Sequence, residues 1–262
     1  MIQEELAKEW RKAGIEEGDT VLLHSSLRRT LKQYLKKKEK ISVQTVLESF
    51  EEAVGSKGTL IFPLFNFDFA NGVPFDIRYT PSHMGVLTEA ARKHPAAVRT
   101  GHPIYSFVAI GYQAEKFRGI DNFSGYGNDS PFGVLKELNG KIAILNLPDQ
   151  NSMTFYHYVE EMNDVPYRYH KEFTGEYAGA DGVVKKKTYG LFVRDLEKGV
   201  RTDVDPMGEL LWCEGLYTGQ RYNQGSGLRI VSAKKLYEYV SEKINAGCSK
   251  GLLYSIEGES NV

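Results

Sequence analysis

Cysteine is scarce in this chain, with only Cys213 and Cys248 among 262 residues. The two are far apart and form no Cys-x-x-Cys pair, which argues against both a zinc site and a disulfide framework. Two reduced thiols in a cytoplasmic protein are the simplest interpretation, and we expect no metal site.

Long apolar runs are also missing. No window approaches the roughly 20 apolar residues of a membrane span. The first fifteen residues, MIQEELAKEWRKAGI, mix charged and apolar residues, unlike a signal peptide.

Neither sign of charge is in excess, because the chain has 33 Lys and Arg and 34 Asp and Glu. With a net charge of -1, the protein as a whole does not attract nucleic acid or an anionic membrane. We therefore expect a cytoplasmic protein that inserts into no membrane and binds no nucleic acid.

Several common catalytic motifs are absent. The chain has no GxxxxGK(S/T) loop, no strand-anchored GxGxxG, no GxSxG elbow and no HExxH. Nucleotide hydrolysis and nicotinamide chemistry therefore lose their usual signatures. A hydrolase with Ser25 or Ser26 as its nucleophile stays an alternative, although neither serine has an elbow motif around it.

What is present is an alternation of strand and helix patterns. Composition is that of a globular domain, with 41% hydrophobic and 26% charged residues, and we expect one domain over 1–262. The predicted strands are Thr20–Leu23, Thr59–Phe62, Phe107–Gly111 and Lys141–Leu147. The predicted helices are Ile2–Ala13, Ser42–Val54, Met84–Lys93, Pro131–Leu138 and Ser232–Asn245. This alternation predicts an α/β fold, three-layer α/β/α with a central mixed sheet.

The second half of the chain has a different pattern. Polar residues alternate with β-branched or aromatic ones over Glu172–Val204, around the turn signal Asp181-Gly182. We expect a β-hairpin-rich insertion there, over about residues 172–222. The irregular stretches 66–82 and 120–130 are long for a compact domain, and such loops often shape a binding site. The lysine run 36–40 is interpreted as a solvated loop or helix end, with a phosphate-contacting patch as the alternative.

Two polar clusters lie beside predicted strands. His24-Ser25-Ser26-Leu27-Arg28 directly follows a buried strand, where α/β folds present ligand-binding groups. Its hydroxyls and cation suit a phosphate-bearing cofactor. Arg99-Thr100-Gly101-His102-Pro103 is a rigid polar turn that leads into Ser106-Phe107. An ordinary polar loop is the alternative for each cluster.

The third cluster carries acid–base chemistry. If residues 154–160 are helical, Thr154, His157 and Glu160 lie three apart on one face. The carboxylate can then hold the imidazole in one tautomer, and a histidine that titrates near neutral pH is the usual general base. Helix surfaces also carry such pairs by chance, so the spacing alone is a weak signal.

Seven short motifs follow one another along the chain: Asp19–Leu27, Gly58–Pro63, Pro74–Asp76, Met84-Gly85 with Glu89 and Arg92, Arg99–Pro103, Ser130-Pro131, and Thr154-x-x-His157-x-x-Glu160. In this order they resemble the aminoglycoside 3-N-acetyltransferase family. The resemblance covers roughly residues 15–165 and weakens afterwards.

The resemblance implies an acetyl-CoA-dependent N-acetyltransferase with a fold distinct from that of the GNAT enzymes. It also implies a catalytic base at His157, oriented by Glu160, with the Thr154 hydroxyl as a candidate for stabilising the oxyanion. The expected CoA contacts are His24, Ser25, Ser26, Leu27, Arg28, Arg99, Thr100, His102, Pro103, Ser106 and Phe107. Homologues suggest a homodimer.

The chain departs from the family in two places. Arg28–Leu35 replaces a glycine-rich turn, and the segment Pro166–Lys171 interleaves cations with aromatic rings. A polycationic aminoglycoside would favour an acidic site, whereas Arg168 and Lys171 beside tyrosines suit an acceptor with a phosphate and a stackable base. The alternative for these cations is surface pairing with Glu160, Glu161 or Asp164.

We therefore expect an N-acetyltransferase that acetylates a nucleotide-linked amino sugar for a surface polysaccharide such as lipopolysaccharide. The expected acceptor contacts are Phe75, Asp76, Tyr126, Asn128, Arg168 and Lys171. An aminoglycoside acetyltransferase that confers antibiotic resistance is the leading alternative. A CoA-binding module without catalysis is a more distant one.

Overall fold

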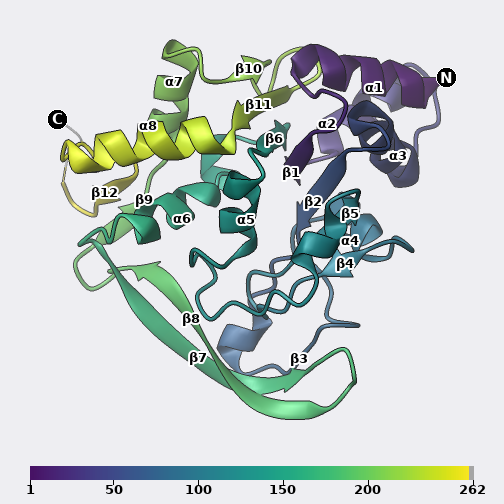
Figure 1. The fold of residues 1–262 in the computed structure, drawn as a ribbon. Helices are drawn as coiled ribbons and strands as arrows, with labels where there is room; N and C mark the ends of the chain where they lie inside the picture. Colours follow the sequence, from purple (N-terminus) through teal and green to yellow (C-terminus); the bar gives the residue numbers. More distant parts are fainter. Residues whose placement is uncertain (260–262) are drawn as a thin grey trace.

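A seven-stranded mixed sheet forms the centre of the computed structural model, which describes residues 1–259 (Figure 1). Its strands lie in the order β10-β11-β6-β1-β2-β5-β4. β1 (Thr20–Ser25) pairs in parallel with β2 (Thr59–Pro63) on one side and with β6 (Lys141–Leu145) on the other. β5 (Phe107–Gly111) pairs antiparallel with β2 and with β4 (Val98–Arg99). β11 (Leu228–Ser232) pairs antiparallel with β6 and with β10 (Thr218–Gly219). The predicted mixed sheet is confirmed.

Helices cover both faces of this sheet. Along β1, Val21 and Leu23 pack into the core of one face, and Leu22 packs into the core of the other, because successive side chains of a strand alternate. The first face carries α1 (Ile2–Ala13), α2 (Arg28–Lys36), α3 (Val43–Val54) and α4 (Val86–Arg92). The second carries α5 (Pro131–Glu137), α6 (Phe155–Met162), α7 (Asp205–Cys213) and α8 (Ala233–Asn245). The three-layer architecture is therefore as predicted.

The order in which strands are added to the sheet reverses beside β1. The chain passes from β1 to β2 on one side, and β6 joins β1 on the other side. In open α/β sheets, ligands bind in the crevice outside the carboxyl ends of the strands at such a point. Here residues 26–27 follow β1, and residues 146–148 follow β6.

A long hairpin forms a second, three-stranded sheet below the helices in Figure 1. β7 (Arg168–Ala178) and β8 (Val184–Arg194) pair along their full length, with Asp181-Gly182 in the turn as predicted. β3 (Phe75–Asp76) adds to the β7 edge. The remaining short elements are β9 (Val200–Thr202), β12 (Tyr254–Ile256), η1 (Asp68–Asn71), η2 (Ala114–Phe117) and η3 (Asp149–Asn151).

Two helices were not predicted. Residues 28–36 form α2 although they are rich in cations, because Leu27, Leu31 and Tyr34 recur at helical spacing and pack against the first-face core. Helix α7 lies inside the range 172–222, where we expected a hairpin-rich insertion and predicted no helix. Its Met207 and Leu211 are buried in the core.

Within residues 1–259 no helix has the length and apolarity to cross a membrane. No group of three or more His, Cys, Asp or Glu side chains in the same range could hold a metal ion.

Candidate active site

Helix α6 places the predicted histidine and glutamate together. His157 Nδ1 lies 2.8 Å from Glu160 Oε2, as their spacing of three residues on a helix predicts. Glu160 is fully buried, whereas 16% of the His157 side chain is exposed. Within residues 1–259 the other ring nitrogen of His157, Nε2, makes no hydrogen bond. That nitrogen is therefore free to exchange a proton with a ligand.

His157 lines a cavity of about 270 Å³ between α6 and the β7–β8 hairpin. The aromatic ring of Tyr126 lies 5.3 Å from the imidazole, in an edge-on arrangement. The cations Arg168, Lys171 and Arg194 also line this cavity, and no carboxylate does so within residues 1–259. The other residues that line it are Tyr105, Tyr169, Phe173, Leu191, Phe192, Val193 and Leu196.

Thr154 is the N-cap residue of α6, one turn before His157. Its hydroxyl caps no backbone N–H, is buried, and has no hydrogen-bond partner within residues 1–259. Buried hydroxyls are normally satisfied. Thr154 is not among the residues that line the His157 cavity, so its contact with a ligand stays a prediction.

The predicted acceptor contacts divide into two groups. Tyr126, Arg168 and Lys171 line the His157 cavity. Asn128 is exposed and accepts a hydrogen bond from Tyr158 at 3.3 Å. Phe75 and Asp76 lie on β3 at the hairpin edge, where Phe75 is buried against Tyr177 and Asp76 pairs with Arg78. The structure does not bring Asn128, Phe75 or Asp76 to this cavity.

Residues 24–28 run from the end of β1 into the start of α2. Ser25 and Ser26 are half-buried, and neither hydroxyl makes a hydrogen bond within residues 1–259. Arg28 is exposed at the start of α2, and Leu27 is buried. His24 is buried, and burial, together with the nearby Arg229, lowers its pKa to about 3. The two serines and Arg28 are thus accessible, whereas His24 stays uncharged in the core.

Asn146 positions this loop, and the sequence analysis missed it. Its backbone has a positive φ of 57°, which asparagine tolerates better than most residues. Its amide nitrogen donates to the Ser26 carbonyl at 3.2 Å and to the Thr30 hydroxyl at 3.0 Å. Its amide oxygen accepts from Arg29 at 3.1 Å. An asparagine near the end of the predicted strand Lys141–Leu147, where β-propensity disfavours it, was the only signal that could have found it.

The second predicted CoA cluster, residues 99–107, is bonded internally. His102 is fully buried, and its Nδ1 accepts from the backbone N–H groups of Ile104 and Tyr105. The Thr100 hydroxyl accepts from the Phe107 N–H at 2.9 Å. Pro103, Ser106 and Phe107 are also buried. These groups stabilise the turn itself, which matches the ordinary-turn alternative, and their contact with CoA stays a prediction.

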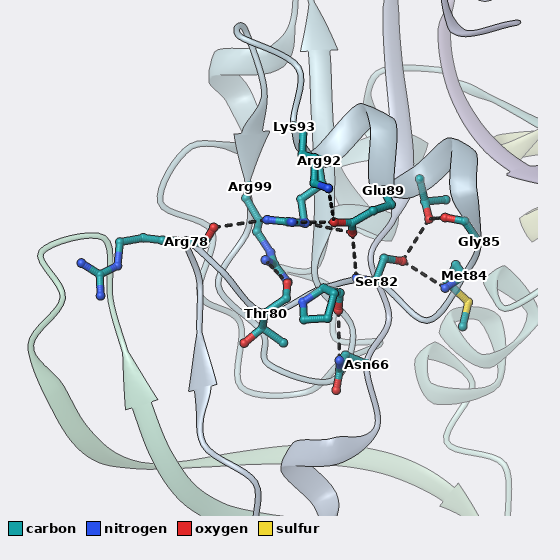
Figure 2. Close-up of polar contacts among 12 residues, drawn as sticks. Asn66, Arg78, Thr80, Ser82, Met84, Gly85, Glu89, Arg92, Lys93 and Arg99 are labelled. Atoms are coloured by element: carbon teal, nitrogen blue, oxygen red, sulfur yellow. Dashed lines mark hydrogen bonds and ion pairs between the residues drawn. The ribbon is translucent and has the colours of Figure 1, made fainter. Parts of the chain in front are cut away.

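Arg99 belongs to a network that fixes the segment before α4, shown in Figure 2. Its Nη1 donates to the carbonyls of Ile77 at 3.0 Å and Thr80 at 2.7 Å. Arg92 binds both carboxylate oxygens of Glu89, and this pairing lowers the pKa of Glu89 to about 2. The family motif residues Glu89, Arg92 and Arg99 thus hold residues 77–82 in place.

Two sequence relatives have related names. Aminoglycoside N(3)-acetyltransferase VII of Streptomyces paromomycinus is 27% identical over 184 residues, which cover 62% of this chain and 60% of the relative. Aminoglycoside N(3)-acetyltransferase III of a Salmonella species is 27% identical over 206 residues, which cover 71% and 69%. The chain thus spans about three fifths of the first relative's length.

A solved structure has the same fold. Aminoglycoside acetyltransferase AAC(3)-Xa superposes with a TM-score of 0.76 at 22% identity, over 92% of each chain. The expected non-GNAT fold is therefore confirmed.

The comparisons correct the expected acceptor. A nucleotide-linked amino sugar for a surface polysaccharide was the wrong prediction, because the relatives are named for aminoglycosides. Arg168, on which that interpretation depended, is also not free for a phosphate. Its side chain is buried, and its Nε lies 2.8 Å from Glu160 Oε2.

The family itself is clear from a match to a sequence model. The model described as aminoglycoside 3-N-acetyltransferase matches residues 22–245, from within β1 to the end of α8. The acyltransferase class expected from the motifs is confirmed at the level of the family. This protein belongs to the aminoglycoside 3-N-acetyltransferase family.

Proposed function

We propose that this protein is an acetyl-CoA-dependent N-acetyltransferase that acetylates an amino group of an aminoglycoside. The observation that carries the proposal is the His157–Glu160 pair, in which Nε2 stays free beside a cavity. An amine attacks a thioester only in its neutral form, so the reaction needs a base beside the amine. The family to which the chain belongs supports the acceptor class.

His157 would act as that base. As the amine nitrogen bonds to the acetyl carbon, Nε2 takes a proton from the nitrogen, and the carbon–sulfur bond then breaks. The proton passes from the imidazolium to the departing thiolate or to solvent. Glu160 would hold the ring by accepting a hydrogen bond from Nδ1. The Thr154 hydroxyl, buried without a partner, is our candidate donor to the oxyanion.

The cations of the cavity favour the reactive form of the acceptor. An ammonium group near Arg168, Lys171 and Arg194 loses its proton more readily than it does in water, because like charges disfavour the protonated form. The other ammonium groups of an aminoglycoside would have to lie outside this cavity.

Acetyl-CoA would bind at the end of β1. Free hydroxyls on Ser25 and Ser26 and the exposed Arg28 suit its phosphate groups, and open α/β sheets bind ligands at the carboxyl ends of strands where the strand order reverses, as it does beside β1. We assign the binding of acetyl-CoA, the acetyl donor, to these three residues.

The test is thiol release from acetyl-CoA with kanamycin-type aminoglycosides, for the wild type and for His157→Gln. Acceptor-dependent release by the wild type alone is the expected result. Binding of acetyl-CoA in isothermal titration without release by any amine would favour the non-enzymatic alternative. Release without any amine would favour the hydrolase. A homodimer stays a prediction, which the mass of the protein in solution tests.

A further inference from the structure

The Arg168 guanidinium contacts both members of the His157–Glu160 pair. Its Nε lies 2.8 Å from Glu160 Oε2, and its Nη2 lies 2.8 Å from His157 Nδ1. Its Nη1 donates to the Phe192 carbonyl on β8 at 3.0 Å, which fixes the guanidinium to the hairpin. Only 5% of the Arg168 side chain is exposed. This cation is therefore part of the interior of the site.

A buried carboxylate without a cation would be unfavourable here. Glu160 is fully buried, and an uncompensated charge in the interior is costly, so the group would tend to take up a proton. If the carboxylate stayed ionised with only His157 beside it, it would favour the imidazolium. An imidazolium cannot accept a proton from an amine. Either outcome would impair the base that the proposed function needs.

We infer that Arg168 is a positioning residue, whose guanidinium holds the Glu160 carboxylate against His157 Nδ1 and keeps the imidazole uncharged. In this arrangement Nδ1 carries the ring proton and donates it to Oε2, the guanidinium forms an ion pair with the same carboxylate, and the lone pair of Nε2 stays available to a ligand. The inference rests on the proposed function for its catalytic meaning. The contacts of Arg168 with Glu160 and His157 themselves do not depend on that function, because they are present in the folded chain without any substrate.

The groups around His157 agree with this role. Burial and then Arg168 lower the pKa of His157, and Glu160 opposes this shift. Arg194 of β8 lowers this pKa further. Tyr126 and Tyr105, which line the same cavity, are buried, and burial raises their pKa values, so both stay neutral. Glu161 of α6 accepts a hydrogen bond from Ser124, and burial raises its pKa.

Titration of the histidine rings by NMR tests the inference without any substrate. The samples are the wild type with ¹⁵N-labelled histidine, Arg168→Met, Arg168→Lys and the control Lys185→Met, with the His157 signals assigned by His157→Gln. We expect Arg168→Met to raise the midpoint for His157 by about one pH unit or more. Arg168→Lys, which keeps the charge, should raise it by less. Lys185 is an exposed cation of the same hairpin, and its loss should change nothing.

Activity gives the second readout. The acid limb of kcat/KM should move to higher pH in Arg168→Met by the same amount as the NMR midpoint. A merely structural role would instead lower the rate equally at every pH. Circular dichroism and the signals of the other histidines show whether the variant is folded.

Two results would overturn the inference. One is an unchanged His157 midpoint in folded Arg168→Met. The other is a neutral His157 in the wild type with its proton on Nε2, which would make Arg168 a donor to Nδ1 and block the base. If Arg168→Met does not fold, two other measurements test the inference: which ring nitrogen of His157 carries the proton in the wild type, and the titration of His157 in Arg168→Lys. A shifted midpoint in a protein that acetylates no aminoglycoside would refute the proposed function and leave the role of Arg168 intact.

Discussion

Gly208 packs so closely on Asp149 that a Cβ atom at residue 208 would lie 2.5 Å from the carboxyl carbon. The Asp149 carboxylate is buried and accepts hydrogen bonds from Tyr156 and Tyr217 at 2.8 and 2.7 Å. It also accepts from the buried Arg229 at 2.6 Å. Because Gly208 has no side chain, α7 leaves room for a polar network that joins α6, η3 and β11.

Gly208→Ala should destabilise the fold. Alanine gains about 1 kcal/mol of helix propensity over glycine, but the clash displaces a carboxylate with three buried partners. We expect a net loss of about 1–3 kcal/mol, measured as the free energy of unfolding in urea. Glu209→Ala, at the next and exposed position, is the control and should change stability by less than about 0.5 kcal/mol. Equal effects of the two substitutions would contradict this account.

His157→Gln should lower turnover by about a hundredfold or more, since a positioned base contributes that much. Its affinity for acetyl-CoA should stay within about twofold of the wild type, because the donor is assigned to residues 25–28. Glu160→Gln should lose less turnover, since the base itself remains. Steady-state kinetics and isothermal titration measure both quantities. Retention of more than about a tenth of the turnover by His157→Gln would exclude this histidine as the base.

Asn146→Gly should weaken acetyl-CoA binding by about tenfold. Glycine accepts the positive φ, but it removes the hydrogen bonds that hold Ser26 and Thr30, each worth about 1 kcal/mol. Asn139→Gly is a matched control, because Asn139 also has a positive φ, of 51°, and is exposed. Isothermal titration with CoA compares the two. If both variants bind CoA as the wild type does, the Asn146 contacts do not shape the donor site.

Stability should fall as pH drops below about 6.5. Burial lowers the pKa of His24 to about 3 and that of His102 to about 4, so the unfolded chain binds protons that the folded chain excludes. Each group contributes a slope of about 1.4 kcal/mol per pH unit between its two pKa values. His24→Leu should remove about that much of the slope between pH 6 and 5. Urea unfolding at several pH values measures it, and an unchanged slope would mean that His24 is not buried in neutral form.

Lys171→Glu should lower the KM for a polycationic aminoglycoside several-fold, because it replaces a repulsive charge on the cavity wall by an attractive one. The KM for acetyl-CoA should not change. Lys185→Glu, on the same hairpin but outside the cavity, is the control. A raised KM for acetyl-CoA in Lys171→Glu would instead assign this lysine to the donor.

The parts of the site that depend on local geometry were predictable. The spacing of His157 and Glu160 brings them together in any helix, and the apolar run after Asp19 predicts β1 and the polar loop that follows it. Asn146 was not predictable, because its partners Ser26, Arg29 and Thr30 lie more than 100 residues away in sequence.

Arg168 shows why burial is hard to read from a sequence. Its pairing with Glu160 was one of the alternatives, but as a surface contact. The side chain is buried because the hairpin packs across α6, an arrangement of distant segments that residues 160–171 do not encode by themselves. Residues 99–107 show the converse, since a motif that suggests ligand contacts consists of groups whose hydrogen bonds go to other parts of the protein or to the motif itself.

The base, its carboxylate and the guanidinium come from one short piece of chain, with His157 only 3 residues from Glu160 and 11 from Arg168. Closing so short a loop loses little chain entropy, and the Phe192 carbonyl of β8 then fixes the guanidinium from a more distant part of the chain. Beyond Arg168 and the Phe192 carbonyl that fixes it, the hairpin contributes side chains that line the cavity, such as Lys171 and Phe173. These side chains can therefore change in size or charge over evolution, which would alter which amines enter while the proton-transfer unit persists.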